Sequence, residues 1–238
     1  MQWEPKLVNF GIRHKRLFGF LGRAGDIIDA IISLEGTKPF PEGCFTKIGW
    51  PTQVTARIQN DDQTLVVECN IDGLVLTVDL EETGLTRDQA KDAFATLSEI
   101  ALKISGGHKT VDRIGIIDNY SFHNPSPGRR ATHAITKLEG LGNPVDFALR
   151  ASFRTPTEDG LVKGNVNDWK NTIIHVVTEK EDEDSDAPDV LRVSIDYQIY
   201  FRPMQSFSLS LIEEHYREFL TRIQKLQSGP FLAIQDAR

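Results

Sequence analysis

The sequence predicts an α+β protein in which antiparallel strands form the sheet or sheets and the helices cover one face. Helical three-to-four spacing follows groups of alternating strands, turn dipeptides separate those strands, and the order strand, helix, three strands, helix occurs twice. We therefore expect one compact domain with an internal pseudo-duplication, the first half at residues 1–107 and the second at 108–238. The sequence leaves open whether the halves share one sheet or form two packed lobes.

The first half begins with an alternating stretch at residues 7–18, which predicts a strand with one solvated face. Gly19 to Gly25 breaks the alternation, and we expect a loop there ahead of a short amphipathic helix at 27–34. Asp72-Gly73 is a strong hairpin signal between alternating runs. The three strands that follow the helix are expected at Thr52–Gln59, Thr64–Asn70 and Leu74–Leu80.

Helix signals close the first half and the same order of elements then returns. Thr86 and Gln89 form a capping box, and Gly106-Gly107 ends the helix that they begin. The alternating run Val111–Phe122 opens the second half, and we expect it in the interior of the sheet near the junction of the halves. The later elements are expected as a helix at 131–138, strands at Val145–Arg154, Trp169–Thr178 and Val190–Phe201, and a final helix capped by Ser210 and Glu213.

Composition limits the classes of function. A net charge of −7 disfavours nonspecific binding to nucleic acid or to anionic membranes. Cys44 and Cys69 are too few for a disulfide framework, which favours a reduced setting. No signal peptide and no apolar run of about 20 residues is visible, so we expect a cytoplasmic protein without a membrane span.

The motif Arg113-Ile114-Gly115-Ile116 lies in the strand that opens the second half. With the element order, it resembles a sporadically distributed family of uncharacterised prokaryotic proteins of similar length, whose mid-chain strand has an Arg-apolar-Gly-apolar pattern. That pattern usually continues into Arg and an aromatic residue, whereas here Ile117-Asp118-Asn119-Tyr120 follows. The resemblance implies no known activity.

The segment Gly19-x-x-Gly22-x-x-Gly25 is the first candidate site, because loop amides before a helix can hold an anion. The spacing matches neither a dinucleotide fingerprint nor a P-loop, and a flexible turn beside a solvated strand is the alternative. The basic residues that surround this segment are Arg13, Lys15, Arg16 and Arg23.

Strand parity gives a second candidate site, a polar sheet face of mixed charge that could bind a ligand or a partner. Plain solvated sheet with cross-strand ion pairs is the alternative. The residues that parity assigns to this face are Arg150, Ser152 and Arg154, then Ser194, Asp196, Gln198 and Tyr200, and with them Arg113 and Asn119.

No motif pairs a nucleophile with a base or gathers metal ligands, and the acidic run at 179–186 lacks the glycine and glutamate of a calcium loop. We therefore expect no cofactor, no metal and a non-enzymatic protein that binds a protein partner or itself through sheet and helix faces. One alternative is an anion- or RNA-binding module that uses the basic N-terminal segment. Another is a small-molecule sensor whose cleft between the halves is lined by Trp169, Tyr197, Phe201 and Arg113.

Overall fold

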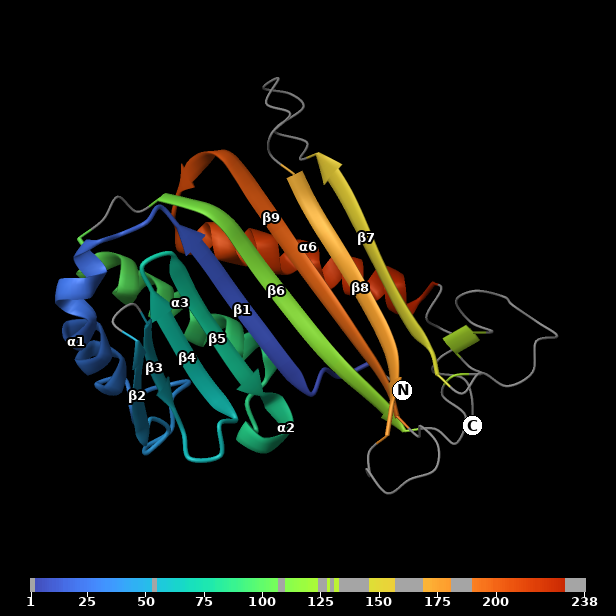
Figure 1. Ribbon diagram of the computed structural model, residues 1–238, viewed down its shortest axis with the longest axis horizontal. Coiled ribbons are helices and arrows are strands. Elements are labelled where there is room, and N and C mark those ends of the chain that lie inside the picture. The colour runs from blue at the N-terminus through green and yellow to red at the C-terminus, as the bar shows by residue number, and fades with distance from the viewer. Residues whose placement is uncertain are drawn as a thin grey trace.

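The computed structural model describes residues 3–52, 55–106, 110–123, 128, 131–132, 146–156, 169–180 and 190–229. These parts form one nine-stranded sheet in the order β2-β3-β4-β5-β1-β6-β9-β8-β7, with every neighbouring pair antiparallel (Figure 1). The predicted α+β class is therefore confirmed, and both halves of the chain contribute to a single sheet.

The elements follow the expected order in part, because the first half has four strands after its first helix, where three were expected, and a short additional helix before its final helix. The strands are β1 (Leu7–His14), β2 (Lys47–Thr52), β3 (Thr55–Gln59), β4 (Leu65–Asn70), β5 (Gly73–Asp79), β6 (Thr110–His123), β7 (Ala148–Pro156), β8 (Trp169–Glu179) and β9 (Val190–Ser206). The helices are α1 (Gly19–Ile32), α2 (Leu80–Thr83), α3 (Arg87–Ile104) and α6 (Leu209–Gln227).

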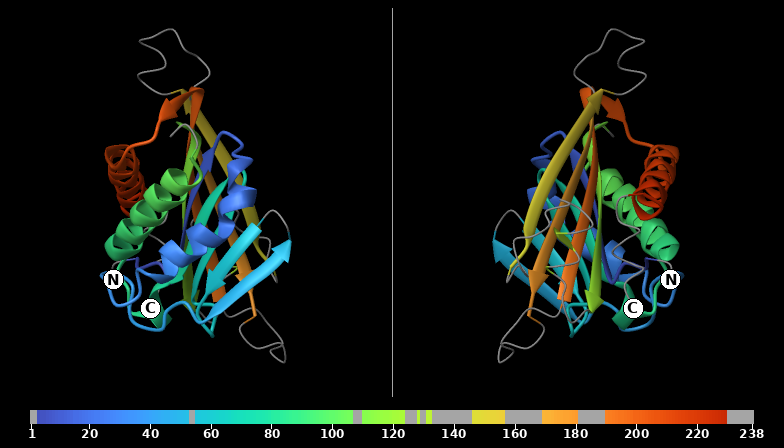
Figure 2. Two further views of the ribbon diagram at one scale, coloured as in Figure 1. Left: turned by 90° about the vertical axis from the view of Figure 1, so that its left-hand side faces the viewer. Right: turned by 90° about the vertical axis from the view of Figure 1, so that its right-hand side faces the viewer.

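One face of the sheet is covered and the other is open. Helices α3 and α6 lie side by side against the covered face, and α1 packs against α3 and β3 (Figure 2). Strand β1 shows the division, because Val8, Phe10 and Ile12 are buried under the helices while the residues between them are partly exposed. None of the described helices covers the opposite face, which we call the open face.

Strands β1 and β6 occupy the centre of the sheet. Their register pairs Phe10 with Ile116 and Ile12 with Ile114, so both strands place large apolar side chains in the same core. Strand β6 also pairs with β9 along nearly its whole length. The prediction that this strand lies in the interior of the sheet is confirmed.

The expected loop at Gly19–Gly25 is wrong, because helix α1 already begins at Gly19. Phe20 and Ile27 are buried on one side of that helix, and this burial outweighs the poor helix propensity of glycine. A Cβ atom at Gly22 or Gly25 would meet nothing within 4 Å, so these glycines satisfy no steric need. A Cβ at Gly19 would lie 2.9 Å from the Ser105 carbonyl oxygen. Of the three glycines, only Gly19 is therefore needed to let the helix approach the Ser105 backbone closely.

Local sequence signals predicted the start of α3 correctly and the start of α6 only approximately. The capping box of Thr86 and Gln89 is present in both directions at the start of α3. The N-cap of α6 is Ser208, whose hydroxyl accepts from the Leu211 amide, so the expected cap at Ser210 is two residues late.

The other boundary differences concern short segments. The expected strand at 52–59 is divided between the end of β2 and the start of β3. The expected helix at 131–138 lies almost entirely outside the described residues. Among the described helices, none offers a stretch long and apolar enough to cross a membrane.

Candidate functional site

A line of arginine and aromatic side chains crosses the open face from the centre of the sheet toward β7. The strand register places Arg13 opposite Arg113, Arg113 opposite Tyr200, and Tyr200 opposite Trp169. Arg154 of β7 completes the line, with its guanidinium carbon 5.0 Å from the centre of the Trp169 ring. We call these five residues the arginine–aromatic row.

Stacking holds the row together. The Trp169 and Tyr200 rings stack with centres 4.8 Å apart and planes 19° apart. The guanidinium carbons of Arg13 and Arg113 lie 5.9 Å and 6.0 Å from the centre of the Tyr200 ring. The ring faces are thus occupied by one another and by arginines, and the guanidinium groups are fixed at the surface of the sheet.

Only part of the positive charge in the row is neutralised. Asp112 accepts from Arg13 Nε at 2.6 Å and from Arg202 Nη1 at 3.0 Å, and this contact raises the pKa of Arg13. Arg113 forms no ion pair with any described residue, and its Nε is buried without a hydrogen-bond partner. Arg154 is exposed and likewise has no carboxylate partner among the described residues.

A chain of polar side chains runs along β9 from the row. The Tyr200 hydroxyl donates to Gln198 at 2.5 Å, and the Gln198 amide donates to Asp196 Oδ2 at 2.5 Å. Burial raises the pKa of Asp196, while Arg113 and Arg150 act in the opposite direction. Asp196 Oδ1 is buried without a partner among the described residues, so this carboxylate still has an unsatisfied acceptor.

Two glycines leave bare backbone on the open face beside the row. Gly11 of β1 and Gly115 of β6 are directly paired, two residues along their strands from Arg13 and Arg113. The nearest atoms to an added Cβ would lie at 3.8 Å for Gly11 and 3.6 Å for Gly115, which is ordinary contact. Neither glycine has a positive φ or a close contact that would exclude a side chain. Each glycine therefore matters for the open face itself, where it leaves the backbone uncovered.

The predicted basic N-terminal segment does not form one surface. Arg13 belongs to the row, whereas Arg16 pairs with Asp72 at 2.9 Å and Arg23 pairs with Asp26 at 3.0 Å. These exposed pairs already balance two of its charges. Lys15 lies at the turn between β1 and α1, and the acidic run at 179–186 lies mostly outside the described residues.

The expected cleft between the halves is not formed by the four residues assigned to it. Tyr197 and Phe201 are buried on the covered face, while Trp169 and Arg113 lie on the open face. The reason is strand parity, because Tyr197 and Phe201 are an odd number of positions from Tyr200 on β9. Those residues therefore cannot line one pocket.

The covered face contains a charged cluster that was not predicted from the sequence. Asp118 of β6 is fully buried and meets Arg87 Nη2 at 2.7 Å. The Tyr120 hydroxyl donates to the same Asp118 oxygen at 2.9 Å and accepts from Arg87 Nη2 at 3.3 Å. Burial raises the pKa of Asp118 to about 6, and the arginine opposes this rise. We call these three residues the buried cluster.

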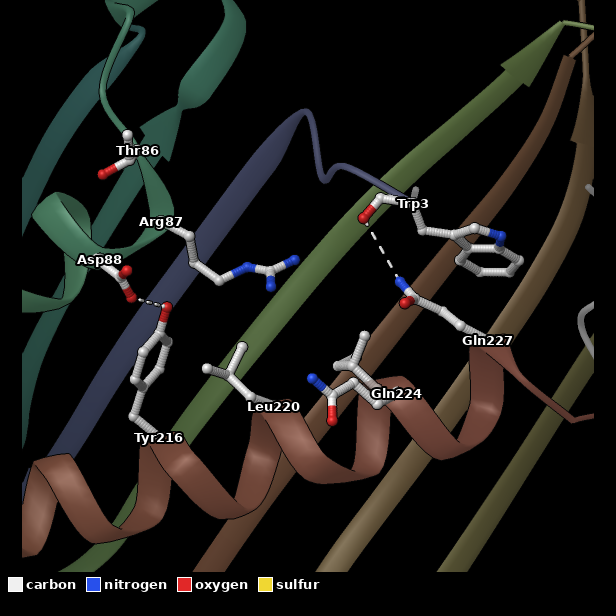
Figure 3. Close-up of a pocket in the computed structure, with 9 residues that line it drawn as sticks. Trp3, Thr86, Arg87, Asp88, Tyr216, Leu220, Gln224 and Gln227 are labelled. Carbon is white, nitrogen blue, oxygen red and sulfur yellow. Dashed lines mark hydrogen bonds between the residues drawn. The ribbon is translucent and has the colours of Figure 1, made fainter. Parts of the chain in front are cut away.

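The buried cluster adjoins a cavity of about 250 Å³ between α3 and α6. Figure 3 shows Arg87 reaching from the first turn of α3 toward the strands, with Trp3 at the opposite end. The Tyr216 hydroxyl donates to Asp88 at 2.7 Å, and the Gln227 amide donates to the Trp3 carbonyl at 3.4 Å. The remaining lining residues are Thr86, Leu220, Ile223 and Gln224.

One signal for the buried cluster was present in the sequence. Asp118 has the same strand parity as Ile114, Ile116 and Tyr120, so it interrupts the apolar phase of β6. A carboxylate in that phase must be buried, and a buried carboxylate needs a cation. Nothing local identifies Arg87 as that cation, because it lies 31 positions earlier on a different element.

Comparisons with known proteins do not assign this chain to a family. No protein-family model matches the chain, and the search of curated proteins found no match. The resemblance drawn from Arg113–Ile116 therefore remains a prediction.

Proposed function

We propose that the protein is a non-enzymatic binding protein whose open face binds an acidic polypeptide through the arginine–aromatic row. The observation that carries this proposal is the set of guanidinium groups that stacking fixes on an uncovered sheet face. In a chain with net charge −7, the face around the row collects more positive than negative charge. Its charged residues are Arg13, Arg113, Arg150, Arg154 and Arg202, against Asp112 and Asp196.

Several features favour a polypeptide over a single-stranded nucleic acid. Nucleic-acid platforms offer aromatic faces on which bases stack, and the faces of Tyr200 and Trp169 are already covered. The row instead offers N–H donors, and planar guanidinium groups suit carboxylates in a bidentate geometry. Acidic side chains of a partner would also satisfy Arg113, which lacks a described carboxylate partner.

The paired glycines support the approach of an extended chain. Gly11 and Gly115 remove two side chains from the centre of the open face, next to Arg13 and Arg113. Glycine within a strand costs stability and packs nothing, so bare backbone here has a use if a partner's chain approaches closely. The partner's carboxylates then reach the row while its main chain lies over the glycines.

Binding of an acidic peptide tests the proposal directly. A fluorescent peptide of residues 179–189 of this chain, Glu-Lys-Glu-Asp-Glu-Asp-Ser-Asp-Ala-Pro-Asp, serves as the ligand, and anisotropy reports binding at low and at physiological salt. We expect the double variant Arg113→Met/Arg154→Met to bind at least about tenfold more weakly, since charge-assisted hydrogen bonds are worth about 1.5–3 kcal/mol each. Arg23→Met/Arg217→Met removes the same charge from the helices and should bind as the parent does.

The glycines provide a second variant that separates binding from folding. Gly11→Ala/Gly115→Ala should fold normally, because both Cβ atoms fit at ordinary contact distances, and should bind the peptide several-fold more weakly. A parent protein that ignores the peptide at low salt would refute the proposal. Tighter binding of a uridine oligonucleotide than of the peptide would replace it with nucleic-acid binding. Peptide binding together with salt-sensitive dimerisation in the ultracentrifuge would identify a second copy as the partner.

We also propose that the chain is an internal duplication. Strands β1 and β6 are antiparallel neighbours at the centre, and the strands follow outward as β5, β4, β3 on one side and β9, β8, β7 on the other. Helix α3 follows β5 after the short helix α2, and α6 follows β9 directly. Superposition of the two halves by a twofold rotation, in an experimental structure, tests this proposal, and an offset in strand register would contradict it.

A further inference from the structure

We propose that the cavity between α3 and α6 binds a small uncharged molecule with a planar amide group, such as a carboxamide or a lactam. This site is on the opposite side of the sheet from the row and does not depend on the function proposed for the open face. It lies between a helix of the first half and a helix of the second (Figure 3). A volume of about 250 Å³ is somewhat below the roughly 300–1,000 Å³ of sites for drug-sized ligands, so the ligand is small.

Arg87 supplies hydrogen-bond donors toward the cavity. Its contacts with Asp118 and Tyr120 both use Nη2, which fixes the guanidinium group from the side of the strands. Neither Nε nor Nη1 donates to a described residue, and because Nε is buried away from any accessible space, Nη1 is the nitrogen left to face a ligand. A guanidinium group that is held by a buried carboxylate and retains a free NH2 group is positioned to donate to a carbonyl oxygen.

Hydrogen-bond acceptors face the same cavity. Asp88 uses Oδ1 for the Tyr216 hydroxyl and keeps its second oxygen, and Gln227 uses its amide nitrogen for the Trp3 carbonyl and keeps its oxygen. The side chain of Gln224 makes no hydrogen bond with any described residue, so it adds both a donor and an acceptor. The N–H groups of Arg87 and the acceptor oxygens of Asp88 and Gln227 together match the C=O and N–H of an amide.

The charge balance excludes an anion as the best ligand. Arg87 is the only cation among the described residues that line the cavity and is already paired with Asp118, while Asp88 adds a negative charge at the rim. A carboxylate ligand would meet this charge, while a cation would meet the guanidinium group. The apolar body of a neutral ligand has Leu220 and Ile223 to contact, along with the rings of Trp3 and Tyr216 at the two ends.

Three molecules of nearly one shape test the proposal on the full-length protein. Benzamide is neutral, benzoate is an anion and benzamidine is a cation, so charge changes while the ring stays the same. We expect benzamide to bind with a Kd of about 1 mM or tighter, a strength suited to so few atoms, and the other two at least about fivefold more weakly. The indole N–H signals in an NMR titration locate the site, because Trp3 lines the cavity and Trp169 lies on the open face.

Variants keep the test decisive. Leu220→Trp fills the cavity and Gln224→Leu removes an amide, and each should weaken benzamide binding several-fold. Thr221→Leu lies on the same helix outside the cavity and serves as the control. Failure of benzamide to shift the Trp3 signal, a larger response to either charged molecule, or undiminished binding to Leu220→Trp overturns the proposal. Peptide binding by the row is measured separately, so the two proposals fail independently.

Discussion

The two faces of the sheet hold arginines in opposite surroundings. Arg113 on the open face stacks on Tyr200 and has no described carboxylate partner. Arg87 under the helices meets the fully buried Asp118 at 2.7 Å and the Tyr120 hydroxyl at 3.3 Å. Both sites combine arginine with aromatic rings, and they differ in access to solvent and in the balance of charge.

The two surroundings predict which property each arginine controls. A charge in contact with water loses little when its partner is removed, so Arg113 can be kept free for a ligand. A charge buried with a single counter-ion cannot lose that counter-ion without leaving an uncompensated charge in a medium of low polarity. We therefore expect the row to govern binding and the buried cluster to govern stability.

Arg87→Met should give the largest effect. It leaves Asp118 buried without its cation, and we expect the free energy of unfolding to fall by about 3–5 kcal/mol. Arg113→Met, the matched change on the open face, should alter it by less than about 1 kcal/mol. Urea unfolding of the two variants decides this, and equal losses would contradict the division between the faces.

Removing both charges of the buried cluster should recover most of that loss. Arg87→Met/Asp118→Leu replaces the pair with apolar groups, and such replacements are often neutral or stabilising by about 1–4 kcal/mol. We expect the double variant to be more stable than Arg87→Met alone, which shows coupling between the two sites. If the losses of the single variants simply add in a double-mutant cycle, the two groups do not act as a pair.

The pH dependence of stability should expose two buried groups that act in opposite directions. Burial lowers the pKa of His215 to about 3, so its unfolded form binds more protons below about pH 6.5 and the fold loses stability as the pH falls. Burial raises the pKa of Asp118 to about 6, so the folded form binds more protons between about pH 4 and pH 6 and stability falls as the pH rises through that range.

His215→Phe should therefore change the slope of stability against pH. Between about pH 5 and pH 6 the variant loses the histidine contribution, and its stability should fall with rising pH by up to about 1.4 kcal/mol per unit relative to the parent. Chemical unfolding at several pH values measures the slope. Parallel curves for the parent and the variant would show that the folded form of His215 takes up protons as readily as the unfolded chain does.

Arg154→Met should give the smallest effect on folding. It removes an exposed guanidinium group from the Trp169 ring, and such contacts are worth about 0.5–1 kcal/mol. We expect a loss of stability of that size with a clear loss of peptide affinity. A loss above about 2 kcal/mol would show that the row supports the fold and would weaken its assignment as a binding surface.

Local patterns in the sequence predicted the frame of the sheet and its best-formed helix. Alternation in Val111–Phe122 and the capping box at Thr86 and Gln89 depend on neighbours in sequence, and both are confirmed. The prediction of a loop at Gly19–Gly25 was wrong for the opposite reason. The helix there is stabilised by burial of Phe20 and Ile27 against distant parts of the chain. Local propensity loses to tertiary packing there.

The candidate sites were predictable only in part. Strand parity predicted that Arg113, Arg154 and Tyr200 share one polar face. It did not predict that these side chains stack in a row, because the stacking depends on the register between strands. The partnership of Arg87 and Asp118 joins a helix to a strand and has no sequence spacing of its own. Contacts of this kind are set by the packed fold, which a single sequence does not contain.

The central pairing of β1 with β6 has a consequence for how the chain reaches its native state. The side chain of Asn119 donates to the Leu7 carbonyl, a contact between positions 112 residues apart. Contacts of such long range slow folding, because a large loop must close before they form. During synthesis β1 can pair with β5 well before β6 emerges, so its other edge stays unpaired in the nascent chain and is open to aggregation until the second half arrives.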